Sequence, residues 1–143
     1  MLGEWLRDFA EEFADTLELK EGEFTIDAVP QDLEVRMDRS HLRQVLWNLC
    51  DNAVKYASET GGILVEMHGG KMQGEKRPFI EVVDSGLGVD QATADKIFEP
   101  FFTARSGGTG LGLYISRELC ELNHATTVYL DRPGSGSRLI MEL

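Results

Sequence analysis

Residues 48–56 have the sequence Asn48-Leu49-Cys50-Asp51-Asn52-Ala53-Val54-Lys55-Tyr56. In an α-helix, residues three and four apart lie on one side, so Asn48, Asn52 and Lys55 share a face that Tyr56 adjoins. Amide oxygens can ligate Mg²⁺ without adding charge, and a lysine ammonium can contact phosphate oxygens. The stretch therefore indicates either a helix that binds a metal and a phosphate or a helix with an ordinary polar face.

The helix that contains this stretch is predicted to begin after Asp38, a good N-cap, because apolar residues then recur at helical spacing. An amphipathic helix is predicted at the start of the chain, where apolar residues recur at helical spacing. Its apolar side packs either in the core of this domain or against a preceding domain, and it consists of Trp5, Leu6, Phe9, Phe13 and Leu17. The other predicted elements are strands at 24–26, 33–37, 63–68, 79–83, 128–130 and 137–143, a loop at 69–78, a short helix at 90–98 and a helix at 111–122. Because helices and strands mix without a strict βα repeat, we expect an α+β fold, a two-layer sandwich with helices on one face of a mixed, mostly antiparallel sheet.

The composition excludes several classes of protein. A chain of 143 residues, 42% hydrophobic and 27% charged, suits one globular domain. With 14 Lys and Arg against 25 Asp and Glu, the net charge of −11 argues against nucleic-acid binding, and an anionic ligand must be held by local groups. No apolar run reaches the roughly 20 residues that cross a bilayer, so we expect no membrane contact by this domain. Cys50 and Cys120 lack metal-ligand spacing and are predicted to be core residues in a reducing compartment.

A second polar segment follows the strand predicted at 79–83, where Asp84 is followed by Gly86 and Gly88. Glycine allows a tight backbone path and the close approach of a ligand. A carboxylate at the buried end of a strand can accept a hydrogen bond from an exocyclic amine such as that of adenine. The alternative is a turn that only ends the strand.

Glycines also precede the helix predicted at 111–122, in Gly107-Gly108-Thr109-Gly110-Leu111-Gly112-Leu113-Tyr114-Ile115. Backbone N–H groups at such a helix start can bind phosphates, although a plain glycine-rich loop fits equally well. The segment lacks the Gly-Lys-Ser or Gly-Lys-Thr of a Walker loop, and no strand leads directly into it as a dinucleotide fingerprint requires. Residues 99–109 before it show no periodicity and are a candidate mobile loop.

Four segments, in this order along the chain, resemble the N, G1, F and G2 boxes of sensor histidine kinases. They are Asn48 to Tyr56, Asp84 to Gly88, Phe98-Glu99-Pro100-Phe101-Phe102 and Gly108 to Leu113. That family belongs to the superfamily of gyrase, Hsp90 and MutL-type ATPases, whose ATP-binding domain is the Bergerat fold. The resemblance covers about residues 35–143 and includes a closing Gly-x-Gly-Ser turn. Residues 119–123 resemble the nitrogen-regulation and type IV pilus branch of these kinases.

The resemblance implies a nucleotide site formed by Asn48, Asn52, Lys55, Tyr56, Asp84, Gly86, Gly88, Phe102, Thr103, Arg105, Gly108, Thr109, Gly110, Leu111, Gly112 and Leu113. In this site Asn52 would ligate Mg²⁺, with Asn48 beside it in support. Lys55 would contact phosphate, and Tyr56 would pack against the adenine ring. Asp84 would hydrogen-bond the adenine amino group.

The resemblance also implies a lid at residues 99–109 that would close over ATP. Its base would be anchored by Phe98, Phe101 and Phe102. Gly86 and Gly88 would shape the pocket wall, and the backbone of residues 108–112 would wrap the phosphates. Arg105 would either meet the γ-phosphate or remain a solvated loop arginine.

The resemblance favours a kinase over an ATPase. Hydrolysing relatives carry a glutamate general base four residues before the metal-binding asparagine, where this chain has the neutral amide of Asn48. The family's phosphoacceptor histidine is followed directly by an acidic residue, and His41, His68 and His124 do not fit that box. We therefore expect ATP, ADP and Mg²⁺ as ligands, no autophosphorylation by this chain alone, and an acceptor histidine on a dimerisation domain outside it.

The expected protein is a single catalytic domain over residues 1–143, with residues 1–20 near the junction to the dimerisation domain. We expect it to be monomeric alone and cytoplasmic, within a membrane-anchored parent that passes phosphate to a response regulator. The alternative is a degenerate nucleotide-sensing or protein-docking module. The chain departs from the family at Asn123-His124-Ala125, where many members have a Gly-Gly pair, and this leaves the turn after the last helix open.

Overall fold

The computed structural model of this protein describes residues 2–27, 33–56, 65–71, 78–84, 112–131 and 137–142. The short helix predicted at 90–98, the lid predicted at 99–109 and the turn around Pro133 lie outside these residues. Within the described ranges, none of the helices has the length and apolar character needed to cross a membrane.

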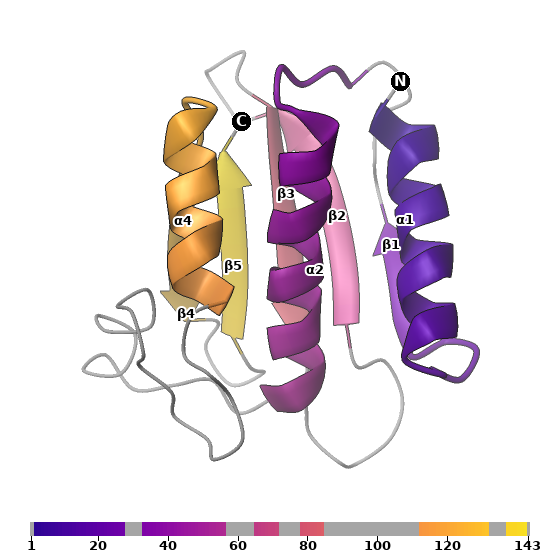
Figure 1. Cartoon of the computed structure of the whole chain (residues 1–143). Coiled ribbons are helices and arrows are strands. Elements are labelled where there is room, and N and C mark those ends of the chain that lie inside the picture. Colours follow the sequence, from indigo (N-terminus) through magenta and orange to yellow (C-terminus); the bar gives the residue numbers. More distant parts are fainter. Residues whose placement is uncertain are drawn as a thin grey trace.

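The described residues form three helices on one face of a five-stranded sheet (Figure 1). In chain order the elements are α1 (Leu2–Thr16), β1 (Phe24–Asp27), α2 (Arg39–Tyr56), β2 (Val65–Lys71), β3 (Pro78–Asp84), α4 (Gly112–Leu122), β4 (Thr126–Asp131) and β5 (Ser137–Glu142). The strand order is β1-β2-β3-β5-β4. Only the β1–β2 pair is parallel among these strands, and the other three pairs are antiparallel. The predicted two-layer α+β sandwich with a mostly antiparallel sheet is confirmed.

Helix α2 begins where the sequence predicts, because Asp38 caps it. The Oδ1 atom of Asp38 accepts hydrogen bonds from the backbone N–H groups of Ser40, at 2.9 Å, and His41, at 3.1 Å. These donors satisfy first-turn groups that have no partner inside the helix. The hydroxyl of Ser40 and the backbone N–H of His41 also lower the pKa of the Asp38 carboxyl.

The core lies between the helices and the sheet. Helix α1 buries Leu2, Leu6, Phe9 and Phe13, helix α2 buries Leu42, Val45, Leu46, Leu49, Cys50 and Ala53, and the sheet contributes Val65, Met67, Ile80 and Val82. Helical spacing thus places one apolar stripe of each helix on the sheet. Of the two roles considered for the opening helix, core packing is the one that the structure shows.

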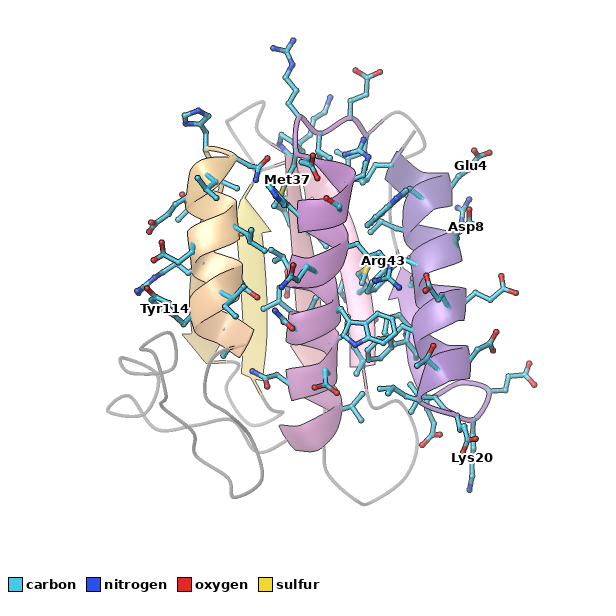
Figure 2. The ribbon with its side chains drawn as sticks, in the orientation of Figure 1. Glu4, Asp8, Lys20, Met37, Arg43 and Tyr114 are labelled. Atoms are coloured by element: carbon cyan, nitrogen blue, oxygen red, sulfur yellow. The ribbon has the colours of Figure 1, made fainter. Side chains whose placement is uncertain are left out.

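An aromatic cluster joins α1 to α2. The ring of Phe13 lies 4.9 Å from that of Trp47, centroid to centroid, and Phe9 meets the same tryptophan edge-on at 6.1 Å. Arg43 projects from α2 toward α1 (Figure 2), stacks over Trp47 at 5.1 Å and pairs with Glu12 on the opposite helix. Aromatic pairs add about 0.5–1.5 kcal/mol beyond the area they bury, so this cluster fixes the N-terminal helix on the domain.

The strand predicted at 33–37 is wrong. Leu33, Val35 and Met37 are buried and the residues between them are exposed, but the segment has no place in the sheet. Arg39 Nη1 donates to the carbonyl oxygens of Val35, at 3.4 Å, and Met37, at 3.2 Å. The alternating pattern therefore reports one buried side of an extended segment, whose carbonyls are bound by a side chain in place of a neighbouring strand.

The loop predicted at 69–78 is wrong at its ends. Strand β2 continues to Lys71, and β3 begins at Pro78, which pairs with it. Gly70 pairs with Phe79, and a Cβ added to Gly70 would lie 3.2 Å from Cε1 of that ring. The phenylalanine thus covers a glycine across the strands, which stabilises a position that reads as a loop in sequence.

Candidate functional site

Residues 48–56 and the glycine-rich segment at 107–115 are in contact where α2 passes the start of α4, through Asn48 and Gly112. Asn48 Nδ2 donates hydrogen bonds to the carbonyl oxygen of Gly112, at 3.2 Å, and to the hydroxyl of Ser116, at 3.2 Å. Ser116 Oγ in turn donates to the same Gly112 oxygen at 2.9 Å. Residues 64 positions apart in sequence are therefore joined by a closed triangle of three hydrogen bonds.

The partners of Asn48 fix the orientation of its amide. A carbonyl oxygen can only accept, so the group facing Gly112 must be Nδ2, which contacts both the Gly112 oxygen and the Ser116 hydroxyl. Within the part of the chain that the structure describes, Asn48 Oδ1 accepts no hydrogen bond. Asn48 is partly exposed.

The second polar segment ends a strand at the same end of the molecule. Asp84 is the last residue of β3 and pairs with Val65, the first residue of β2. Figure 1 shows the start of β2 toward the same end of the molecule as the end of α2 and the start of α4. Asn52, one turn beyond Asn48, is partly exposed, and the backbone of Lys55 and Tyr56 completes α2. The fold thus gathers these parts of the three predicted segments.

The other predicted site residues are Leu113 and a group that lies outside the described residues. Leu113 is buried in the core at 6% exposure, so its side chain packs against the protein and only its backbone is open to a ligand role. The predicted residues outside the described ones are Gly86, Gly88, Phe102, Thr103, Arg105, Gly108, Thr109, Gly110 and Leu111, together with the lid anchors Phe98 and Phe101. Ser116 was not predicted, although a serine four residues after Gly112 on the apolar stripe of α4 is a signal that the sequence contains.

The opposite end of the α2–α4 pair is joined by Asn123. Its Oδ1 accepts the backbone N–H of Asp38 at 3.1 Å, and its Nδ2 lies 2.8 Å from Leu119 O and 3.0 Å from His41 Nδ1. Because the amide nitrogen donates, Nδ1 of His41 is the acceptor and its proton sits on Nε2. Asn123 therefore connects the end of α4 to the start of α2.

The turn that follows α4 closes without a glycine. His124 adopts a φ of 59°, in the left-handed region, and Ala125 N donates to Cys120 O at 2.7 Å. This is the αL termination that a glycine usually provides. The departure from the family's Gly-Gly pair therefore changes the residue and keeps the turn.

Two histidines and both cysteines among the described residues contact other protein groups or are buried. His41 contacts Asn123, and His68 Nε2 lies 3.2 Å from a carboxylate oxygen of Glu66. Cys50 and Cys120 are free and buried, as predicted, and burial raises the pKa of both thiols. No group of three or more His, Cys, Asp or Glu side chains suited to a metal occurs among the described residues.

Comparisons with known proteins agree on one family. Residues 37–143 match the sequence profile described as histidine kinase-, DNA gyrase B-, and HSP90-like ATPase. The chain is 39% identical over 136 residues to the sensor protein kinase PilS of Pseudomonas aeruginosa, covering 94% of this chain and 26% of PilS. It is 33% identical over 109 residues to the signal transduction histidine-protein kinase AtoS of Escherichia coli, covering 76% of this chain and 17% of AtoS. The chain thus spans about a quarter or less of these relatives.

Solved structures give the same result. The nucleotide-free catalytic domain of histidine kinase ThkA superposes with a TM-score of 0.83 at 29% identity, covering 99% of this chain and 91% of that one. Full-length ShkA in complex with AMPPNP superposes with a TM-score of 0.77 at 30% identity, covering 99% of this chain and 29% of ShkA.

Proposed function

This chain belongs to the histidine kinase-, DNA gyrase B- and HSP90-like ATPase family and is a catalytic domain of the sensor histidine kinase type, and we propose how it acts. It binds ATP together with Mg²⁺ and presents the γ-phosphate to a histidine on a dimerisation domain outside the chain. The parent kinase then passes the phosphoryl group to a response regulator at the cytoplasmic side of a membrane. The catalytic domain contributes positioning and electrostatic stabilisation, and the partner domain contributes the imidazole nucleophile.

The observation that supports this proposal best is the contact of Asn48 with the first turn of α4. It places an uncharged amide acceptor next to the helix start that follows the glycine-rich segment. A protein with a net charge of −11 attracts a triphosphate through such local groups. Neutral side-chain oxygens also suit Mg²⁺, which prefers oxygen ligands and retains several waters.

The residues present fit a magnesium ion bound to the phosphates. Asn52 would ligate the ion, and Oδ1 of Asn48, one turn away, would accept a hydrogen bond from its hydration shell. When bound, the ion would offset the charge of the β- and γ-phosphates. Lys55 follows Asn52 on the same helix and would contact the phosphates directly.

We assign the adenine end of the site to the second segment. Asp84 is the last residue of β3, a strand that packs against α2, so its carboxylate would accept a hydrogen bond from the adenine amino group while Tyr56 packs on the ring. Gly86 and Gly88 would line the pocket. The lid residues Phe102, Thr103 and Arg105, and the backbone of Gly108, Thr109, Gly110, Leu111, Gly112 and Leu113, would enclose the phosphates.

Calorimetric titration with ADP and with a non-hydrolysable ATP analogue, with and without Mg²⁺, tests the proposal. We expect saturable binding that strengthens with Mg²⁺ and weakens at least tenfold in Asp84→Asn, because one hydrogen bond to a charged group contributes about 1.5–3 kcal/mol. Addition of a phosphoacceptor domain in trans should then yield acid-labile phosphohistidine. Failure of the wild-type chain to bind either nucleotide would indicate a degenerate docking module.

A further inference from the structure

Ser116 is a buried hydroxyl in an otherwise apolar stripe of α4. Its side chain is 0% exposed and lies on the same buried side of the helix as Leu113 and Cys120. Among the described residues it is the one polar residue in the buried class. A buried hydroxyl costs free energy unless it is hydrogen-bonded, and an alanine would fill nearly the same space. The role of the Ser116 hydroxyl therefore lies in its hydrogen bonds and not in the space that it fills.

Of the two hydrogen bonds of Ser116, one lies within α4 and the other joins α4 to α2. The bond to Gly112 O, four residues earlier, is one that serines often make inside helices. The bond accepted from Asn48 Nδ2 joins α4 to α2. Because Nδ2 contacts Ser116 Oγ and Gly112 O together, the asparagine amide is held in one rotation about its terminal torsion, which is otherwise broad.

We propose that Ser116 is a positioning residue for the triphosphate end of the nucleotide, an inference that rests on the proposed function. Ser116 makes no contact with ATP. It holds Asn48 Oδ1 and the first turn of α4 in a fixed relation, so that an acceptor for the hydrated metal and the phosphate-binding backbone approach one ligand from two helices. A site organised before binding loses less conformational freedom when the ligand arrives.

The test is Ser116→Ala, measured by calorimetric titration with the Mg²⁺-bound ATP analogue and, separately, with adenosine. We expect the analogue to bind about three- to tenfold more weakly, the range for one hydrogen bond. Adenosine affinity should stay within about twofold of wild type, because adenosine has no phosphate. The Mg²⁺ concentration that gives half-maximal analogue binding should rise. Ser116→Thr retains the hydroxyl and should restore both values.

Asn123→Ala is the matched control, because it breaks the other bridge between the same two helices. It should lower the melting temperature and leave the ratio of analogue to adenosine affinity unchanged. An equal loss for both ligands in Ser116→Ala, or no loss, would overturn the positioning role while wild-type binding upholds the proposed function. Absence of binding by the wild-type chain would overturn both.

Discussion

The α2–α4 pair is bridged by an asparagine at each end, and the two bridges use the amide differently. Asn123 is satisfied at both poles, because its oxygen accepts the backbone N–H of Asp38 and its nitrogen contacts His41. Among the described residues, Asn48 makes hydrogen bonds through its nitrogen alone, to Ser116 and to the carbonyl of Gly112. Asn48 lies inside α2 and Asn123 directly follows the last residue of α4, so the same residue type joins the same two helices at both places.

This difference assigns Asn123 to holding the two helices together and supports the proposed role of Asn48 in binding the nucleotide. A fully hydrogen-bonded amide has no donor or acceptor left for a ligand, so its effect is on stability. An amide with a free acceptor at a partly exposed position can still bind one. Substitutions at the two asparagines should therefore act on different quantities, the free energy of unfolding for Asn123 and the affinity for nucleotide for Asn48.

The largest expected effect comes from Asn48→Asp. A carboxylate cannot donate to the carbonyl of Gly112, and it adds negative charge at the position where we propose that the phosphates bind. We expect about 100-fold weaker binding of the ATP analogue, equivalent to about 2.7 kcal/mol, measured by calorimetry. Gln44→Glu adds the same charge one turn earlier on an exposed position of α2 and should cost far less. Equal losses in the two variants would mean that charge alone, and not the contact with α4, determines affinity.

The next effect is on stability. Asn123→Ala removes the hydrogen bonds that connect α4 to Asp38 and His41, so the free energy of unfolding should fall by about 1–2 kcal/mol. Thermal denaturation followed by circular dichroism should show a melting temperature lower by roughly 3–8 °C. A change in nucleotide affinity as large as that of Asn48→Asp would remove the contrast between the two bridges.

A smaller effect, of opposite sign, is expected at the turn beside Asn123. His124 holds a left-handed backbone conformation at φ 59°, which glycine adopts without steric cost. His124→Gly should therefore raise the free energy of unfolding by about 0.5–1 kcal/mol in chemical denaturation. His124→Ala keeps the Cβ penalty and should give no such gain, so stabilisation by both variants would argue against backbone strain as the cause.

The smallest effect is a pH dependence at the Asn123 end. The pKa of Asp38 is lowered in the folded state by Ser40 and by the backbone of His41. Its contribution to stability is therefore present above the ordinary pKa of 3.8 and is lost as the pH falls through the lowered value. Asp38→Asn keeps a helix cap but cannot titrate, so acid unfolding curves should show a shallower loss of stability below pH 3.8. Parallel curves would show that Asp38 does not contribute.

Features that depend on near neighbours were predictable from the sequence. The cap of α2 needs only the residues from Asp38 to His41, and the helical stripes of α1 and α2 depend on spacings of three and four. The four boxes were predicted in order, and the comparisons confirm the family that they resemble. The fold class followed from the mixture of these local patterns.

Features that depend on distant partners were not predictable. Alternation at 33–37 shows burial but cannot show whether another strand lies alongside, and Gly70 reads as a loop until Phe79 is placed across from it. Ser116 has the same limitation, because its partner Asn48 is 68 positions away in sequence. In the sequence, Asn123 was noticed through comparison with the family alone, because its partners Asp38 and His41 lie more than 80 positions earlier, at the start of α2.

Of the described strands, β5 is the last in sequence order, yet it lies inside the sheet between β3 and β4. During synthesis, β4 therefore leaves the ribosome before the strand with which it pairs, and β3 keeps an unpaired edge until β5 follows. Unpaired edges are where strands of other chains attach. A premature stop codon before Ser137 would accordingly leave β3 and β4 without the strand that pairs with both, and such a product should aggregate more readily.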